Sequence, residues 1–336
     1  MYMKIAIIGN GSWGTALALT LRDKNNVDIW GPLQNEIEDL IRDNENKKYL
    51  SGHQLSGITI TRNAGEAIAD SGLVIMAVPS KYMRPQMKLL SSLFRSGQIV
   101  ISASKGIEQN TYCSMSEIIS EYIPSGAITG ALSGPSHAEE VARGIPTAVT
   151  AAAANPDAAR IVQETCMTEN FRVYTNNDLK GVQIGGAIKN IIAIAAGLSD
   201  GLGFGSNTIS ALMTRGLVEI IRYGKLFGAR QDTFYGLSGL GDLITTCTSR
   251  FSRNHFVGTR LAEGKKWPEI EASMHMVAEG VEAVKAAYRY ASDNSVSMPI
   301  TGQIYKVLFE DMPPRDAVLS LMTRSPRAED EECLTG

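Results

Sequence analysis

The 336-residue sequence has few of the residues that build metal centres and disulfide frameworks. Its only cysteines are Cys113, Cys166, Cys247 and Cys333, which lie far apart and form no C-x-x-C pair. Its four histidines are equally scattered. This spacing argues against a disulfide-stapled domain and against a zinc site. We therefore predict no metal, and we expect idle thiols in a reducing compartment.

A strong charge of one sign and a long hydrophobic run are also missing. The formal net charge is only -3, so composition forces no basic surface and nucleic acid is not an expected partner. Gly9, Asn10 and Gly11 interrupt the apolar residues that follow Lys4, which argues against a signal peptide. No other segment approaches the roughly 18 unbroken apolar residues of a membrane span. We expect a cytoplasmic protein without a membrane span.

What is present predicts two domains, because domains average roughly 150 residues. Residues 1–182 alternate short apolar runs with helical patterns, which is typical of a Rossmann-like, doubly wound α/β domain with a parallel sheet. Residues 183–330 show helical periodicity and predict an all-α domain, followed by an acidic tail at 331–336. The expected strands are Lys4–Ile8, Val27–Trp30, Ile58–Thr61, Val74–Val78, Ile99–Ser102, Ile128–Leu132, Ala148–Ala151 and Phe171–Tyr174. The expected helices of the second domain are Ile188–Leu198, Thr208–Phe227 (begun by Asn207 or Thr208), Arg253–Glu263, Val281–Ser292, Gly302–Phe309 and Pro314–Met322.

A glycine-rich loop follows the first predicted strand and reads Gly9-Asn10-Gly11-Ser12-Trp13-Gly14. Gly9 allows a tight turn, Gly11 lets a pyrophosphate approach the backbone, and Gly14 allows the next helix to pack on the strand. The phosphate would then sit on free N–H groups at the helix N-terminus. The motif predicts that this loop binds NAD(H) or NADP(H).

The second strand leaves the choice of cofactor open. An acid at its end would favour NAD, but the chain reads Trp30-Gly31-Pro32-Leu33-Gln34 there. Asp28 lies within the strand and is discounted. The turn contains no arginine for a 2′-phosphate either.

Three other strand ends carry special sequences at the edge where open α/β sheets bind ligands: Val78-Pro79-Ser80 and the two singled out here, Ala103–Gly106 and Ser133–Ala138. Lys105 lies between a buried strand and Gly106, which favours a functional lysine over a solvated surface charge. The Gly134-Pro135-Ser136 turn offers N–H groups and a hydroxyl, although it is equally consistent with a simple turn.

Lys189 and Asn190 interrupt a helix of otherwise apolar and small residues. A buried lysine can exchange a proton near neutral pH, and Lys105 is a candidate neighbouring cation. Asp242 follows a glycine-rich turn and either holds Lys189 or caps a helix. Ser252 would cap the helix that carries Arg253 and Asn254, and these three favour a phosphate. The sequence thus predicts a phosphorylated small-molecule substrate.

With these residues in hand, the sequence resembles bacterial-type NAD(P)-dependent sn-glycerol-3-phosphate dehydrogenases. The matching stretches run in order through nearly the whole chain: residues 9–16, 104–106, 133–136, 181–190, 200–205, 239–243, 252–254 and 279–280. The resemblance implies interconversion of dihydroxyacetone phosphate and glycerol 3-phosphate, which supplies phospholipid synthesis. It departs at Pro32, where relatives often carry histidine or arginine, and this puts NADP preference in doubt.

The resemblance also implies residue roles. Lys189 would be the catalytic proton acceptor, with Lys105, Asp242 and Asn190 assisting. The implied substrate contacts are Lys105, Gly134, Ser136, Lys189, Asp242, Thr246, Ser252, Arg253 and Asn254. The implied cofactor contacts, beyond the glycines of the loop, are Ser12, Trp13, Tyr49, Lys105, Ala138, Arg253, Val277 and Glu279.

Two other functions stay open at this point. A 3-hydroxyacid or sugar-acid phosphate dehydrogenase would share the architecture. A nucleotide-sensing module would share the loop, but it needs none of Lys189, Asp242 and Arg253. The alanine-rich helices allow a homodimer without requiring one.

Overall fold

The computed structural model describes residues 3–274, 276–326 and 328–329, so the predicted tail at 331–336 lies outside the described residues. The chain forms two compact units, one of Met1–Lys105 and Ser114–Val182, the other of Gly106–Cys113 and Gln183–Gly336. The predicted domain division placed residues 106–113 in the first domain. They pack with the second unit because Ile107 is buried in its core and Gln109 hydrogen-bonds Glu282.

The first unit is built on an eight-stranded sheet with the strand order β10-β9-β8-β7-β6-β1-β2-β5. Most strands are buried apolar runs, as expected for a sheet covered on both faces. The strands are β1 (Lys4–Ile8), β2 (Asn26–Trp30), β5 (Ile58–Ile60), β6 (Leu73–Met76), β7 (Ile99–Ser102), β8 (Ile128–Ser133), β9 (Thr147–Ala153) and β10 (Phe171–Asn176). The prediction of a Rossmann-like α/β fold is confirmed.

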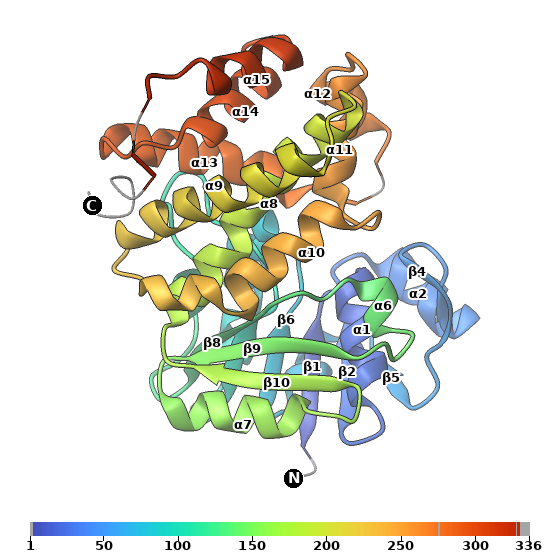
Figure 1. Cartoon of the computed structure of the whole chain (residues 1–336). Coiled ribbons are helices and arrows are strands. Elements are labelled where there is room, and N and C mark those ends of the chain that lie inside the picture. Colours follow the sequence, from blue (N-terminus) through green and yellow to red (C-terminus); the bar gives the residue numbers. More distant parts are fainter. Residues whose placement is uncertain (1–2, 275, 327, 330–336) are drawn as a thin grey trace. The chain divides into compact units, whose positions relative to one another are not determined.

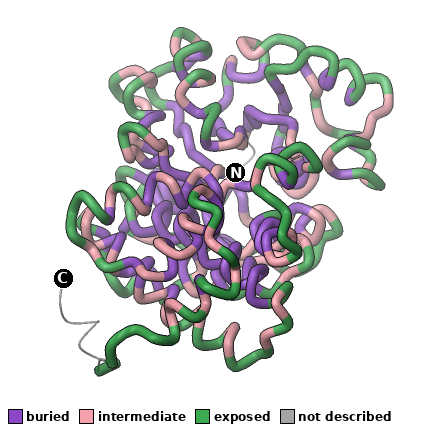
Figure 2. The backbone as a smooth tube through the Cα atoms, turned by 90° about the horizontal axis from the view of Figure 1, so that it is seen from above, coloured by how far each residue is buried: buried purple, intermediate pink, exposed green. Residues whose placement is uncertain are grey.

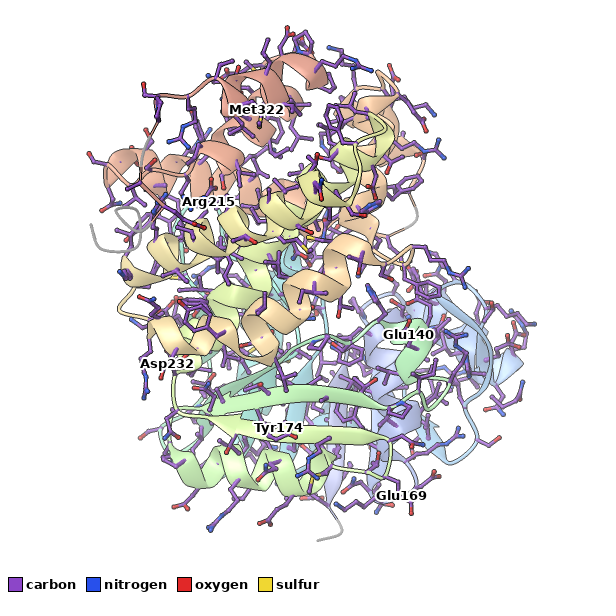
Figure 3. The ribbon with its side chains drawn as sticks, in the orientation of Figure 1. Glu140, Glu169, Tyr174, Arg215, Asp232 and Met322 are labelled. Atoms are coloured by element: carbon purple, nitrogen blue, oxygen red, sulfur yellow. The ribbon has the colours of Figure 1, made fainter. Side chains whose placement is uncertain are left out.

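One strand direction differs from the expected all-parallel sheet. Strand β9, predicted as Ala148–Ala151, runs antiparallel to β8, with Leu132 opposite Ala151. β10 then runs parallel to β9 at the sheet edge (Figure 1). Tyr174 of this edge strand, labelled in Figure 3, is exposed. A short apolar run does not encode strand direction, because both directions bury the same residues.

Helices and a small hairpin complete the first unit. Strands β3 (Glu45–Asn46) and β4 (Leu50–Gln54) form a separate antiparallel pair, which the sequence did not predict. The helices are α1 (Ser12–Leu21), α2 (Gln34–Asp43), α3 (Ala64–Ile68), α4 (Met83–Leu90), α5 (Met115–Ser120), α6 (Ala138–Val141) and α7 (Pro156–Cys166), with short 3-10 turns η1 (Ser80–Tyr82) and η2 (Ser91–Leu93).

The described part of the second unit is helical, as predicted. Its helices are α8 (Leu179–Gly201, which begins in the first unit), α9 (Ser206–Lys225), α10 (Asp242–Thr248), α11 (Arg253–Ala262), α12 (Trp267–Ala272), α13 (Glu279–Asp293), α14 (Pro299–Phe309) and α15 (Pro314–Met322), with a 3-10 turn η3 (Gln231–Tyr235) and a π-helical turn η4 (Leu237–Gly241). Helix α9 begins at Ser206, two residues before the predicted Thr208, and its N-cap is Gly205 instead of Asn207 or Thr208.

Helix α8 is the buried centre of the second unit. It is long and apolar enough by composition to cross a membrane, contrary to the expectation that no segment approaches a span, yet its most apolar window is entirely buried. Figure 2 shows buried backbone in purple inside the units and exposed segments in green around it. Helix α11 packs on α8 backbone to backbone: a Cβ on Gly197 would lie 1.9 Å from the carbonyl oxygen of His255, and one on Gly258 would lie 2.0 Å from that of Ile194.

Candidate active site

The glycine-rich loop joins β1 to α1 and has the shape of a phosphate site. Gly9 adopts a φ of +123°, and a Cβ on Gly14 would lie 2.0 Å from the carbonyl oxygen of Gly9. A Cβ on Gly11 would meet nothing within 4 Å, so this backbone faces open space. Gly11 is the N-cap of α1, and no side chain caps the helix there. Backbone N–H groups at such a helix start fit a pyrophosphate.

Other residues implied in cofactor binding are spread over the first unit. Ser12 is buried and Trp13 is half-buried in the first turn of α1. Ala138 is the buried first residue of α6. The hydroxyl of Tyr49 donates to Glu36 Oε1 at 2.8 Å. Asp28 pairs with Lys4 at 3.1 Å inside the sheet, which agrees with its exclusion as a ribose ligand.

Sequence reasoning missed Glu36. This carboxylate lies in the first turn of α2 and is buried, and its Oε2 accepts a hydrogen bond of 2.9 Å from Asn10 Nδ2 in the phosphate loop. Glu36 lies two residues beyond Gln34, and the first turn of α2 brings its side chain back toward the loop. A test for acids in the first turn of the following helix could have found it.

Lys105 belongs to the first unit and lies against the Gly134-Pro135-Ser136 turn. Its Nζ donates to the carbonyl oxygen of Gly134 at 2.8 Å and to Ser136 Oγ at 3.4 Å. Ser136 Oγ donates to the same carbonyl at 2.9 Å. Gly134 has a φ of +139°, so only glycine adopts this turn without strain. The structure therefore brings together the two strand ends that the sequence singled out.

Lys189 lies on α8 in the second unit, paired with Asp242. Nζ is 2.9 Å from Asp242 Oδ1, and the two side chains are only 5% and 2% exposed. Lys189 also donates to Thr246 Oγ1, which in turn donates to the backbone oxygen of Asp242 at 2.7 Å. Asp242 is the first residue of α10 and not its cap, since Gly241 is the N-cap. Of the two readings of Asp242, the geometry favours the lysine partner.

The π-helical turn η4 positions Asp242. It lies close against α8, because a Cβ on Gly185 would approach the carbonyl oxygen of Ser238 to 2.7 Å. Gly239 in turn packs on the backbone of Phe234, where a Cβ would come within 2.1 Å of the carbonyl oxygen. Such π turns are rare and frequently accompany functional sites. The local glycines thus allow α10 to begin directly opposite Lys189.

Asn190 belongs to a second hydrogen-bond chain. Its Oδ1 accepts from Asn254 Nδ2 at 2.9 Å, and its own Nδ2 donates to the carbonyl oxygen of Gly186 at 3.3 Å. Asn254 Oδ1 accepts from the backbone N–H of Gly280 at 3.0 Å. These bonds tie Asn190 to the start of α11, and its assistance to Lys189 stays a prediction.

The start of α11 has the features of an anion site. Ser252 is its N-cap, and Oγ accepts from the N–H of His255 at 3.1 Å. Arg253 follows directly and donates from Nη1 to the carbonyl oxygen of Val277 at 3.0 Å. Glu279 is the first residue of α13. A capped helix start with an adjacent guanidinium favours a phosphate group.

The chemistry of these two arrangements is complementary. The first unit offers a loop for a dinucleotide pyrophosphate. The second offers a buried lysine that can exchange a proton and, on the adjacent helix, a place for a phosphate.

Comparison with known proteins gives the class. Models of the N-terminal and C-terminal parts of NAD-dependent glycerol-3-phosphate dehydrogenase match residues 4–159 and 178–319. The chain is 47% identical over 328 residues to glycerol-3-phosphate dehydrogenase (NAD(P)+) of Thermoanaerobacter sp., covering 97% of this chain and 99% of that protein. It is 46% identical over 330 residues to the protein of the same name from Carboxydothermus hydrogenoformans, covering 97% and 98%. The crystal structure of glycerol-3-phosphate dehydrogenase from Coxiella burnetii superposes with a TM-score of 0.91 at 34% identity, over 96% of this chain and 99% of that one.

The loop and these matches define an NAD(P)-dependent dehydrogenase. Within that class, the chain belongs to the NAD-dependent glycerol-3-phosphate dehydrogenase family.

Proposed function

We propose that this protein interconverts dihydroxyacetone phosphate and sn-glycerol 3-phosphate with NAD(P)H and NAD(P)+. The observation that carries the proposal is the buried ion pair between Lys189 of α8 and Asp242 of α10. Asn190, the residue after Lys189, is hydrogen-bonded to Asn254 at the start of α11. A proton-transfer group and an anion-binding helix start are thereby held together in one unit. The activity for which the relatives are named supports the same substrate.

Lys189 is the proposed proton carrier. In the reduction, an N–H bond of the Lys189 ammonium breaks and an O–H bond forms at the C2 oxygen; in the oxidation, the neutral amine takes that proton back. Asp242 and Thr246 accept hydrogen bonds from Nζ and so fix its direction. A nicotinamide cofactor, when bound, would supply or accept the hydride at C2. Ser252, Arg253 and Asn254 hold the phosphate, whose binding energy positions C2.

The first unit supplies the remaining proposed contacts. Lys105, Gly134 and Ser136 contact the substrate, and Lys105 stabilises charge on its reacting oxygen. Gly9, Gly11 and Gly14 hold the pyrophosphate. The other proposed cofactor contacts are Ser12, Trp13, Tyr49, Lys105, Ala138, Arg253, Val277 and Glu279.

The proposal extends to the setting of the protein. We place it in the cytoplasm, where it supplies glycerol 3-phosphate for phospholipid synthesis, the usual context of this family. Division at 182/183 into a cofactor domain and a substrate domain is part of the same proposal, except that residues 106–113 pack with the second unit. Assembly as a homodimer is also part of it.

One assay tests the reaction directly. Loss of NADH absorbance on adding dihydroxyacetone phosphate, run in parallel with NADPH, reports turnover. Dihydroxyacetone without phosphate and phosphorylated 3-hydroxyacids serve as alternative substrates, and preference for either would replace the proposed substrate.

A variant tests the proposed proton carrier. Lys189→Ala should lower turnover by at least about 100-fold. Lys180→Ala, which removes an exposed lysine from the same helix, is the matched control and should keep turnover. Near-full turnover of Lys189→Ala would sink the assignment.

A further inference from the structure

Beside the phosphate loop, the buried carboxylate of Glu36 forms an ion pair with the long, partly exposed side chain of Lys48. Glu36 Oε1 lies 2.7 Å from Lys48 Nζ, and the side chains are 7% and 56% exposed. Tyr49 donates to the same oxygen, and Asn10 to the other. Burial acts to raise the pKa of Glu36, but the hydrogen bonds from Lys48, Asn10 and Tyr49 outweigh it and leave that pKa below its ordinary value. Glu36 is therefore an ionised counter-charge for Lys48.

This pair lies at the end of β2. A Cβ on Gly31, the residue after that strand, would lie 2.0 Å from Asn10 Oδ1, so the Asn10 side chain fills the space beside Gly31. The amide nitrogen of the same side chain donates to Glu36. One side chain thus separates the Glu36–Lys48 pair from the strand end. In Rossmann folds this end reads the 2′ position of the adenosine ribose, with an acid for a hydroxyl and a cation for a phosphate.

Glu36 and Lys48 differ in how tightly their side chains are held. Glu36 is buried and held from both of its oxygens, so it stays in place. Lys48 is more than half exposed and belongs to the segment between β3 and β4. When Lys48 leaves, the buried Glu36 carboxylate loses its counter-charge, which is costly, but it keeps its hydrogen bonds from Asn10 and Tyr49. A doubly charged phosphate gives the ammonium a stronger, charge-assisted hydrogen bond in return.

The turn after β2 provides no cation of its own. Residues 31–34 read Gly31-Pro32-Leu33-Gln34. Arg42, on α2, is engaged with Asp39 and Asp43, and Lys47 pairs with Asp43 at 3.1 Å. Arg62 forms a two-bond pair with Glu38. Among these neighbouring cations of the described chain, Lys48 is the one whose partner contacts the phosphate loop.

We propose that Lys48 is the specificity-determining residue for the 2′ position of the cofactor: it turns from Glu36 to the 2′-phosphate of NADP(H) and stays with Glu36 when the ribose carries a hydroxyl. The pair then lets one site take both cofactors. The proposal rests on the dinucleotide site and not on the substrate, so it can fail or hold independently of the proposed reaction.

The test measures binding without turnover. Dissociation constants of NADPH and NADH are determined by calorimetry on the wild type and on Lys48→Met. We expect the NADPH constant to rise about 10- to 100-fold, because one charge-assisted hydrogen bond is lost, while the NADH constant changes less than about 3-fold. Adenosine 2′,5′-bisphosphate, which has the 2′-phosphate but no nicotinamide, should weaken in parallel with NADPH, and 5′-AMP should not.

Lys47→Met is the matched control, because Lys47 is the neighbouring residue, has the same charge, and has a side chain that is 63% exposed. It should leave the ratio of the two constants unchanged. Glu36→Gln keeps one acceptor oxygen, enough for either Asn10 or Tyr49, but removes the counter-charge, and should preserve or tighten NADPH binding. Equal weakening of both cofactors in Lys48→Met, no change in either, or the same ratio change in Lys47→Met would each overturn the proposal.

Discussion

Lys189 and Asp242 form an ion pair of 2.9 Å inside the second unit, with both side chains almost completely removed from water. Burying two charges is costly, and a pair of this kind is strongly destabilised when one partner is removed. A pair kept at that cost points to a role in the reaction. It also makes the carboxylate a positioning residue whose function can be separated from stability.

Asp242→Asn should reveal that role. The variant should lose roughly 3–5 kcal/mol of unfolding free energy, because the Lys189 ammonium remains buried without its counter-charge. Reduction of dihydroxyacetone phosphate needs that ammonium, so the alkaline limb of its pH–rate profile should move to lower pH. Denaturant titration and pH–rate profiles measure the two effects. A pure loss of stability with an unmoved profile would make Asp242 merely structural.

Ser252→Ala tests the anion site at α11. Loss of the cap should cost about 1 kcal/mol of stability, and the KM for dihydroxyacetone phosphate should rise several-fold because the first turn of α11 loosens. Asn155→Ala is the control, since Asn155 caps α7 in the same manner through a bond to the N–H of Ala158. It should cost similar stability without changing that KM. Equal KM values in the two variants would contradict the site.

Gly197→Ala tests the contact between α8 and α11. The new Cβ would overlap the carbonyl oxygen of His255, so the helices must separate at a cost of about 1–3 kcal/mol or more. The KM for the phosphorylated substrate should rise with it. Gly205→Ala is the comparison, because a Cβ there meets nothing within 4 Å. Thermal unfolding and steady-state kinetics of both variants give the answer; an unaffected Gly197→Ala enzyme would refute the close contact.

Glu219 predicts a pH dependence of stability. Its carboxylate accepts from the N–H groups of Ile300 (2.5 Å) and Thr301 (3.0 Å) and so anchors the start of α14. Burial, opposed by these bonds, raises the pKa of Glu219 from 4.5 to about 7. The native state then binds a proton that the unfolded chain has released, so stability falls as pH rises from 4.5 to about 7.

Glu219→Gln has no proton to release there. Between about pH 5 and about pH 8, wild type should lose on the order of 3 kcal/mol relative to this variant, from about 1.4 kcal/mol per pKa unit. Urea unfolding at the two pH values measures the difference. Parallel behaviour of the two proteins would show that Glu219 does not titrate in this range.

Much of the fold could be predicted because its signals are local. Strands such as Ile99–Ser102 are buried on both faces, so a short run of apolar residues is enough to predict them. Ser252 caps α11 where a serine before a helical pattern is expected. The antiparallel direction of β9 and the placement of residues 106–113 depend on contacts distant in sequence, which no short pattern contains.

The site divides in the same way. The loop at residues 9–14 and the oddity of Lys189 in an apolar helix are visible in the sequence. Glu36 was missed because its significance depends on Asn10, which is 26 positions away. The hairpin bearing Lys48 is polar and short, with no strand alternation to reveal it.

The backbone contact of α8 with α11 at Gly197 and Gly258 has a consequence for substrate choice. Helices joined through their main chains have no side-chain layer that could rearrange, so the interval between Lys189 and the start of α11 is constant. Under the proposed roles, this interval sets the distance between the reacting oxygen and the phosphate of a substrate that fits the site. A phosphorylated alcohol with one more carbon between those groups could not place both of them in contact with the protein at once.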